Sequence, residues 1–80
     1  MLIVGNFSYF GITINVSGLN KDQKSNLIMY DVLGSVVFKD ELSPKETQFL
    51  NYDITGLSKG VYIVEIINST QKVVKRLIKQ

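Results

Sequence analysis

The sequence contains neither cysteine nor histidine. Without cysteine, the chain forms no disulfide, binds no metal through thiolates and offers no thiol nucleophile. Without histidine, it lacks the side chain most often used as a general base near pH 7 and the commonest metal ligand. The two absences together predict that the domain is not an enzyme.

Long hydrophobic runs are also missing. No segment approaches the roughly 20 apolar residues that a membrane helix needs, so we expect no membrane insertion. Met1–Val4 is apolar, but it lacks a basic start and is too short for the core of a signal peptide. If the domain is exported, we expect its signal peptide to lie upstream, ahead of a fused cargo domain.

The acidic residues are scattered over predicted loops and turns, and none is placed to form a pair. A glycosidase would need two carboxylates facing one cleft. A Ca²⁺ site would need several oxygen ligands from one loop, for which Asp40-Glu41 is too short. We therefore expect no cofactor and no metal site. The acidic residues are Asp22, Asp31, Asp40, Glu41, Glu46, Asp53 and Glu65.

Positive charge, by contrast, gathers at the end of the chain. The net charge of +2 is too small to argue for nucleic acid, and no aromatic side chains alternate with the basic ones as a base-stacking platform requires. We therefore expect no nucleic-acid partner. The basic segment is either a solvated edge strand or a positive strip for an acidic partner. Its charges are Lys72, Lys75, Arg76 and Lys79.

The residues that are present favour β-structure in one domain spanning residues 1–80. Hydrophobic residues make up 45% and charged residues 20%, as in folded soluble domains. β-Branched and aromatic residues dominate, and no stretch keeps the spacing of an amphipathic helix. Turn residues recur about every 8–12 positions, which is typical of an antiparallel sandwich or barrel. The predicted strands are Phe7–Val16, Leu27–Val32, Val36–Lys39, Phe49–Ile54, Val61–Ile67 and Lys72–Lys79.

Several of these segments carry further structural expectations. Gly11 interrupts Phe7–Val16 and predicts a bulge or kink. Val61–Ile67 is largely apolar on both faces, which indicates a central strand. The charges of Lys72–Lys79 indicate a terminal strand that resists edge-to-edge pairing. The polar segment Asp40–Thr47 is predicted to cross between sheets as a loop.

Two segments carry turn chemistry. In Asp31–Gly34, the aspartate can accept backbone N–H bonds and the glycine can adopt positive φ, which predicts a hairpin. From Leu57 through Gly60 to Tyr62, the residues have the order of a tyrosine corner, in which the tyrosine bonds back to the loop backbone. We expect the residues from Leu57 to Tyr62 to hold the fold that a partner recognises.

A resemblance to a known family rests on three segments in a fixed order: LIMYDVLGSVVF, YDITGLSKGVYIVEI and the terminal KVVKRLIKQ. Together they resemble the type A C-terminal sorting domain of the type IX secretion system in Bacteroidetes, and the resemblance covers Leu27–Gln80. The family typically shows a YDxxG hairpin, an LxxGxY segment and a terminal strand with paired basic residues. The corresponding residues here are Tyr30, Asp31 and Gly34, then Leu57, Gly60 and Tyr62, and finally Lys75 and Arg76.

The resemblance implies an all-β, immunoglobulin-like antiparallel β-sandwich of about six to seven short strands. Such domains end secreted enzymes and adhesins, direct the cargo through the outer membrane, and are removed by a sortase that attaches the cargo to surface lipopolysaccharide. The implied partners are the secretion machinery, a sortase and an upstream cargo, and the implied location is the outer membrane, cell surface or extracellular space. The resemblance also implies that the Gly60 and Tyr62 pair and the Lys75 and Arg76 pair are needed for sorting.

The chain departs from the family's pattern at its start. An Asn-Pro segment usually precedes a Gly-Asn-Phe-like start, but Met1–Val4 stands ahead of Gly5-Asn6-Phe7. This departure predicts an incomplete first strand. An absent strand would leave a sheet edge open to homodimer formation or strand exchange.

Two other functions stay open on the residues alone. An ancillary carbohydrate- or protein-binding module of a secreted multidomain enzyme would need a surface aromatic platform. A structural spacer would tolerate the loss of its C-terminal charges without any loss of trafficking.

Overall fold

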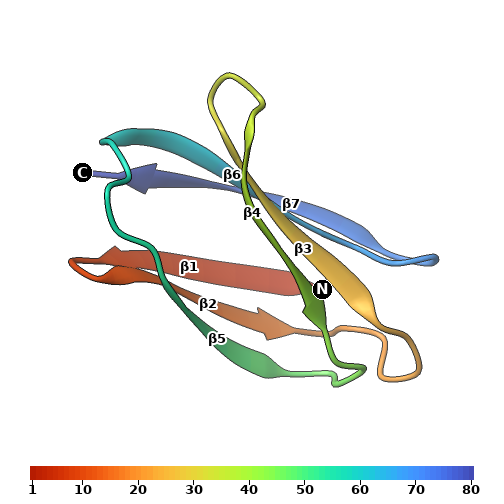
Figure 1. Ribbon diagram of the computed structural model, residues 1–80. Coiled ribbons are helices and arrows are strands. Elements are labelled where there is room, and N and C mark those ends of the chain that lie inside the picture. Colours follow the sequence, from red (N-terminus) through yellow and green to blue (C-terminus); the bar gives the residue numbers. More distant parts are fainter.

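The computed structural model describes residues 1–80, which form two antiparallel β-sheets facing each other across one core (Figure 1). One sheet has the order β1-β2-β5 and the other the order β4-β3-β6-β7. The chain crosses between the sheets after β2, β4 and β5, as in immunoglobulin-like sandwiches. The predicted all-β sandwich is therefore confirmed. The strands are β1 (Leu2–Ser8), β2 (Gly11–Ser17), β3 (Ser25–Asp31), β4 (Val36–Leu42), β5 (Gln48–Asp53), β6 (Gly60–Ile67) and β7 (Lys72–Lys79).

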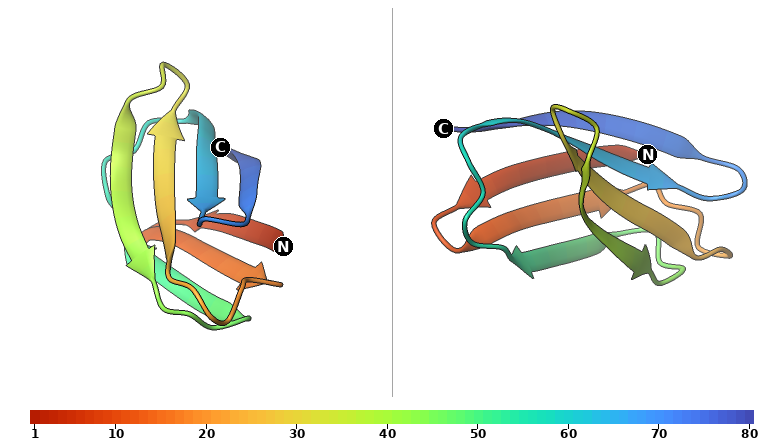
Figure 2. Two further views of the ribbon diagram at one scale, coloured as in Figure 1. Left: turned by 90° about the vertical axis from the view of Figure 1, so that its right-hand side faces the viewer. Right: turned by 45° about the horizontal axis from the view of Figure 1, so that its top comes forward.

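The core lies between the middle strands of the two sheets. Figure 2 shows how these sheets face each other. Alternate side chains along each strand point inward because successive residues of a strand face opposite sides. Burying each of the larger apolar side chains contributes about 1.5–3 kcal/mol. β6 pairs with β3 on one side and β7 on the other, so the predicted central strand is confirmed. The buried residues of β2, β3 and β6 include Ile12, Ile14, Val16, Leu27, Met29, Tyr62, Val64 and Ile66.

No helix in the structure has the length and apolar character needed to cross a membrane.

The single strand predicted over Phe7–Val16 is wrong. The chain reverses at Tyr9 and Phe10, and β1 and β2 pair as a hairpin in which Ser8 lies opposite Gly11. Tyr9-Phe10 contains none of the glycine, asparagine or aspartate that marks a tight hairpin turn. The one interruption in the segment, Gly11, predicted a bulge or kink within a single strand, whereas it marks the first residue after the turn.

Gly11 is not a bulge; it starts β2 and pairs with β1 on one side and β5 on the other. A Cβ atom at this position would collide with the carbonyl oxygen of Tyr52 in β5. The glycine is therefore needed for the close approach of two backbones.

Strand β1 is paired with β2 from Leu2 opposite Ser17 to Ser8 opposite Gly11. Its other edge carries no ladder, although it lies beside β7. The incomplete first strand stays a prediction, because the register describes only the strand that is present.

The crossing loop predicted over Asp40–Thr47 begins too early. Asp40, Glu41 and Leu42 belong to β4, where they pair with residues of β3. Leu42 is almost fully buried, so its apolar side chain holds this polar stretch in the sheet. The loop between the sheets is correspondingly shorter.

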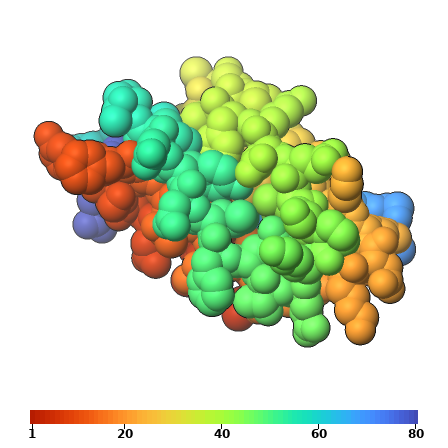
Figure 3. Space-filling view, turned by 60° about the horizontal axis from the view of Figure 1, so that its bottom comes forward, coloured from red at the N-terminus to blue at the C-terminus, as the bar shows by residue number.

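The side of the sandwich formed by β4 and β5 is closed by two aromatic rings. Phe38 and Tyr52 lie with their ring centroids 4.6 Å apart, and the Tyr52 hydroxyl donates a 2.7 Å hydrogen bond to Oδ2 of Asp40. Burial, followed by the hydrogen bond and charge of Asp40, raises the pKa of the Tyr52 phenol. Figure 3 views this side, with the yellow-green and green atoms of β4 and β5 lying against each other.

Candidate functional site

The predicted hairpin at Asp31–Gly34 joins β3 to β4 and is confirmed. Oδ1 of Asp31 accepts hydrogen bonds from the backbone N–H groups of Leu33 (3.0 Å) and Ser35 (2.9 Å). Gly34 has a φ of 86°, a left-handed conformation that glycine adopts without steric cost. Asp31 and Gly34 thus fix the turn, which presents the side chains of Val32 and Leu33 to solvent.

The tyrosine corner is also confirmed. The hydroxyl of Tyr62, which is 6% exposed, donates a 2.7 Å hydrogen bond to the carbonyl oxygen of Ser58. Leu57 packs against the core cluster from the loop before β6. Gly60 begins β6 with a φ of 147°. These residues hold the β5–β6 connection against the sandwich.

The basic terminal strand β7 lies at the edge of its sheet, as predicted. Lys75 and Arg76 are both exposed, but they point to opposite faces. Lys75 pairs with Val64, a core residue, and Arg76 pairs with Ile63 on the solvent side. The two residues that look like one basic pair in the sequence therefore offer their charges to different surroundings.

Arg76 lies in one cross-strand row with Tyr30. Tyr30 is opposite Ile63, and Ile63 is opposite Arg76, so the row runs from β3 through β6 to β7. Val36 of β4 extends the row on the other side of Tyr30. Two of the predicted sorting residues are thereby brought to the same surface, although they lie far apart in the sequence.

We call this surface the outer face, meaning the solvent side of the β4-β3-β6-β7 sheet. Most of its side chains are apolar, although nothing in the chain covers them, because all the strands are used in the two sheets. The sequence showed that β6 is apolar on both sides, but it gave no sign that one side stays uncovered. The apolar residues of the outer face are Ile28, Tyr30, Val36, Val61, Ile63, Ile67, Val74 and Ile78.

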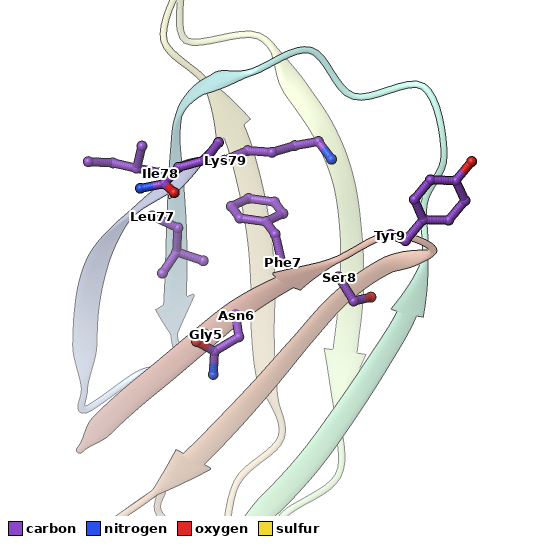
Figure 4. Close-up of a pocket in the computed structure, with 9 residues that line it drawn as sticks. Gly5, Asn6, Phe7, Ser8, Tyr9, Leu77, Ile78 and Lys79 are labelled. Atoms are coloured by element: carbon purple, nitrogen blue, oxygen red, sulfur yellow. The ribbon is translucent and has the colours of Figure 1, made fainter.

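A groove of about 590 Å³ lies between the ends of β1 and β7 (Figure 4). Leu77 is buried beneath it, and Nζ of Lys79 lies 5.8 Å from the centre of the Phe7 ring. Among the residues that line the groove, only Lys79 and Tyr9 carry ionisable side chains. The groove thus brings together no acid and base.

No group of three or more acidic residues that could hold a metal ion is present.

A comparison with protein families gives one match over most of the chain. The model described as the secretion system C-terminal sorting domain matches residues 8–80. No curated protein and no solved structure matches the chain. The matched segment contains the hairpin turn, the tyrosine corner and the terminal basic strand, and it leaves out most of β1.

Proposed function

Since the chain belongs to the secretion system C-terminal sorting domain family, we propose that it carries a cargo protein fused upstream through the outer membrane for surface attachment or release. The domain is a C-terminal sorting signal for type IX secretion, and its family is one of signals rather than catalysts. The cargo is thereby exported to the cell surface or beyond. The domain itself contributes recognition and no chemistry.

The family match across the ordered motifs is the observation that supports this proposal most. The motifs divide into two groups by position. Asp31, Gly34 and Tyr62 are engaged in holding turns, whereas Tyr30 and Arg76 are directed to solvent. The first group would maintain the shape that the machinery recognises, and the second would contact it.

A sortase would act after translocation, removing the domain and attaching the cargo to surface lipopolysaccharide. The location of the mature cargo would then be the outer surface, while a cargo that is cut and not attached would be extracellular. Cell fractionation and the mass of the mature cargo distinguish the two results.

The proposal is tested by fusing residues 1–80 to a fluorescent protein directed to the periplasm of a host with type IX secretion. We expect fluorescence at the cell surface or in the medium. Retention of the fusion in the periplasm would contradict the proposal. Removal of Ile78, Lys79 and Gln80 is the informative truncation, because it spares Leu77, which is only 6% exposed. We expect this truncation to block export while the domain stays folded.

We further propose that the free edge of β1 supports a homodimer. β1 is hydrogen-bonded only to β2, and an unpaired edge is a template for a second strand. Sedimentation of the isolated domain over a range of concentrations tests this. A monomer at all concentrations would contradict it without affecting the sorting function.

One observation favours the alternative of a carbohydrate- or protein-binding module. Tyr9 and Phe10 are 88% and 69% exposed at the β1–β2 turn, and their rings meet edge to face with centroids 5.0 Å apart. Such a pair could contact a sugar ring. Binding on a glycan array that is lost in Tyr9→Ala would support this function.

A further inference from the structure

The outer face is far more apolar than the solvent side of an antiparallel sheet usually is. Such sheets commonly place polar side chains on the side away from the core. Here Ile63 and its neighbours on β3 and β6 are only partly buried, and Val36, Val74 and Ile78 are 49%, 51% and 58% exposed. Contiguous exposed apolar surface of this kind marks interaction sites in soluble domains.

We propose that the outer face is the docking surface for a protein of the secretion machinery that presents an apolar patch flanked by carboxylates. This inference rests on the proposed sorting function and names the surface that would carry it.

Charge on the outer face indicates the chemistry of the partner. Its two carboxylates are already paired: Glu41 lies 3.4 Å from Nζ of Lys24, and Glu65 lies 3.8 Å from Nζ of Lys72. Arg76, in contrast, forms no ion pair, although it stands among apolar side chains. Arginine in such a setting is enriched at interface centres, where it pairs with carboxylates of the partner.

Lys39 extends this pattern to the far edge of the sheet. It lies on β4 opposite Ile28, faces the same side, and also forms no ion pair. The two free cations therefore stand on the two edge strands, Lys39 on β4 and Arg76 on β7, with the apolar side chains of β3 and β6 between them. A complementary partner would place one carboxylate at each side of its own apolar patch.

A second copy of the chain fits this surface less well. Its outer face would bring the same free cations and the same paired carboxylates, so like charges would meet. A lipid surface also fits less well. The apolar side chains are short, lie flush in strands and surround the charged Glu65 and Arg76, whereas membrane binding at an interface favours an apolar face free of charges.

The outer face is accessible in a fused protein. Met1 leads into β1, which belongs to the opposite sheet (Figure 2). A cargo joined at that end therefore begins on the other layer of the sandwich and leaves the outer face open.

The test uses the double variant Val74→Thr/Ile78→Thr, which makes two exposed apolar side chains on edge strand β7 more polar. Threonine keeps the preference for strand structure. The matched control is Leu2→Thr/Val4→Thr on edge strand β1, on the solvent side of the other sheet. Leu2 and Val4 are 61% and 45% exposed, close to the exposures of the tested pair. Thermal unfolding of both double variants verifies that each is folded.

Each variant is fused to the periplasm-directed fluorescent protein, and each is also expressed as a free domain to compete with export of the wild-type fusion. We expect the β7 variant to lose roughly tenfold or more in export and competition, because it places polar hydroxyl groups where apolar side chains would be buried against the partner. The β1 control should behave as wild type. If the β7 variant does not fold, Arg76→Glu replaces it, and the same losses are expected.

The outcomes separate this inference from the function on which it rests. If the wild-type fusion is not exported, both the sorting function and the docking surface are wrong. If the wild type is exported and the folded β7 variant or Arg76→Glu matches it in export and competition, the docking surface is wrong and the sorting function is unaffected.

Other occupants of the outer face give different results. A wild-type dimer that the β7 variant abolishes would assign the surface to a second copy. Binding to vesicles of phosphatidylethanolamine and phosphatidylglycerol that the β7 variant abolishes would assign it to lipid. Either result overturns the proposal.

Discussion

Tyr30 and Arg76 lie in one row across the sheet, separated by Ile63. Their side chains share the solvent side of the β4-β3-β6-β7 sheet, whereas Lys75, the immediate neighbour of Arg76, faces the other way. Two residues from separate sequence motifs therefore belong to one surface, the outer face. This arrangement also divides the basic pair of Lys75 and Arg76 into two residues that can be tested separately.

The first prediction separates these two basic residues. Arg76→Gln should reduce export strongly, because it removes one of the two free cations that flank the apolar side chains of the outer face. Lys75→Gln should reduce it less, because Lys75 faces the side of the sheet that carries Val64 and the core. Both residues are exposed, so the free energy of unfolding should change by less than about 0.5 kcal/mol in either variant. Export of the fluorescent fusion and urea denaturation measure the two quantities. Equal export by the two variants would contradict the division.

The second prediction concerns the hydroxyl groups of two tyrosines. Tyr62→Phe should lower the free energy of unfolding by about 1 kcal/mol, because the bond to the Ser58 carbonyl is lost. Tyr30→Phe is the matched control, since the Tyr30 hydroxyl makes no hydrogen bond within the chain and should leave stability nearly unchanged. Urea denaturation measures both. A Tyr62→Phe variant as stable as the wild type would show that the corner bond does not hold the loop.

The third prediction compares two glycines that are needed for different reasons. Gly11→Ala should lower the free energy of unfolding by about 2–3 kcal/mol, because its Cβ meets the Tyr52 carbonyl and must push β2 away from β5. Gly34→Ala should cost about 1–2 kcal/mol, since its Cβ meets open space and only the left-handed backbone is strained. Thermal or urea unfolding ranks the two. A smaller loss for Gly11→Ala would contradict the close approach.

The sequence predicted most of the fold because its signals were local. The turn at Asp31 and Gly34 and the corner at Tyr62 depend on side chains a few residues from the backbone groups they bind, so their chemistry is visible along the chain. The reversal at Tyr9 and Phe10 carried no such signal. This turn depends on the pairing of β2 with β1 and with β5, which are contacts between residues distant from the turn.

The candidate site was predicted residue by residue but not as a surface. The alternation of residues identified which side chains of β6 share a side. Whether another part of the chain packs against that side depends on how the strands are divided between the two sheets. Register across β3, β6 and β7 is a tertiary property, so the row from Tyr30 to Arg76 could not be read from the motifs alone. The role of these residues in sorting stays a prediction.

The last prediction concerns stability at high pH and rests on Tyr52. Burial, and then the hydrogen bond and negative charge of Asp40, raise the pKa of its phenol in the folded chain. In the unfolded chain the phenol has a pKa of about 10. Above that pH the unfolded chain releases the proton while the folded chain keeps it, so the folded state binds more protons. The free energy of unfolding contributed by Tyr52 is therefore fully present below about pH 10 and falls as the pH rises further.

Urea denaturation of the wild type and Tyr52→Phe across this range tests the effect. Below about pH 10, the variant should be less stable by about 0.5–1 kcal/mol, because it loses the bond to Asp40. Above that pH the difference in free energy of unfolding between the wild type and the variant should become smaller, since only the wild type has this phenol to ionise. Asp40→Asn is the informative control: burial is the largest cause of the shift, so most of the pH dependence should survive removal of the charge. A gap that stays constant with pH would contradict the raised pKa.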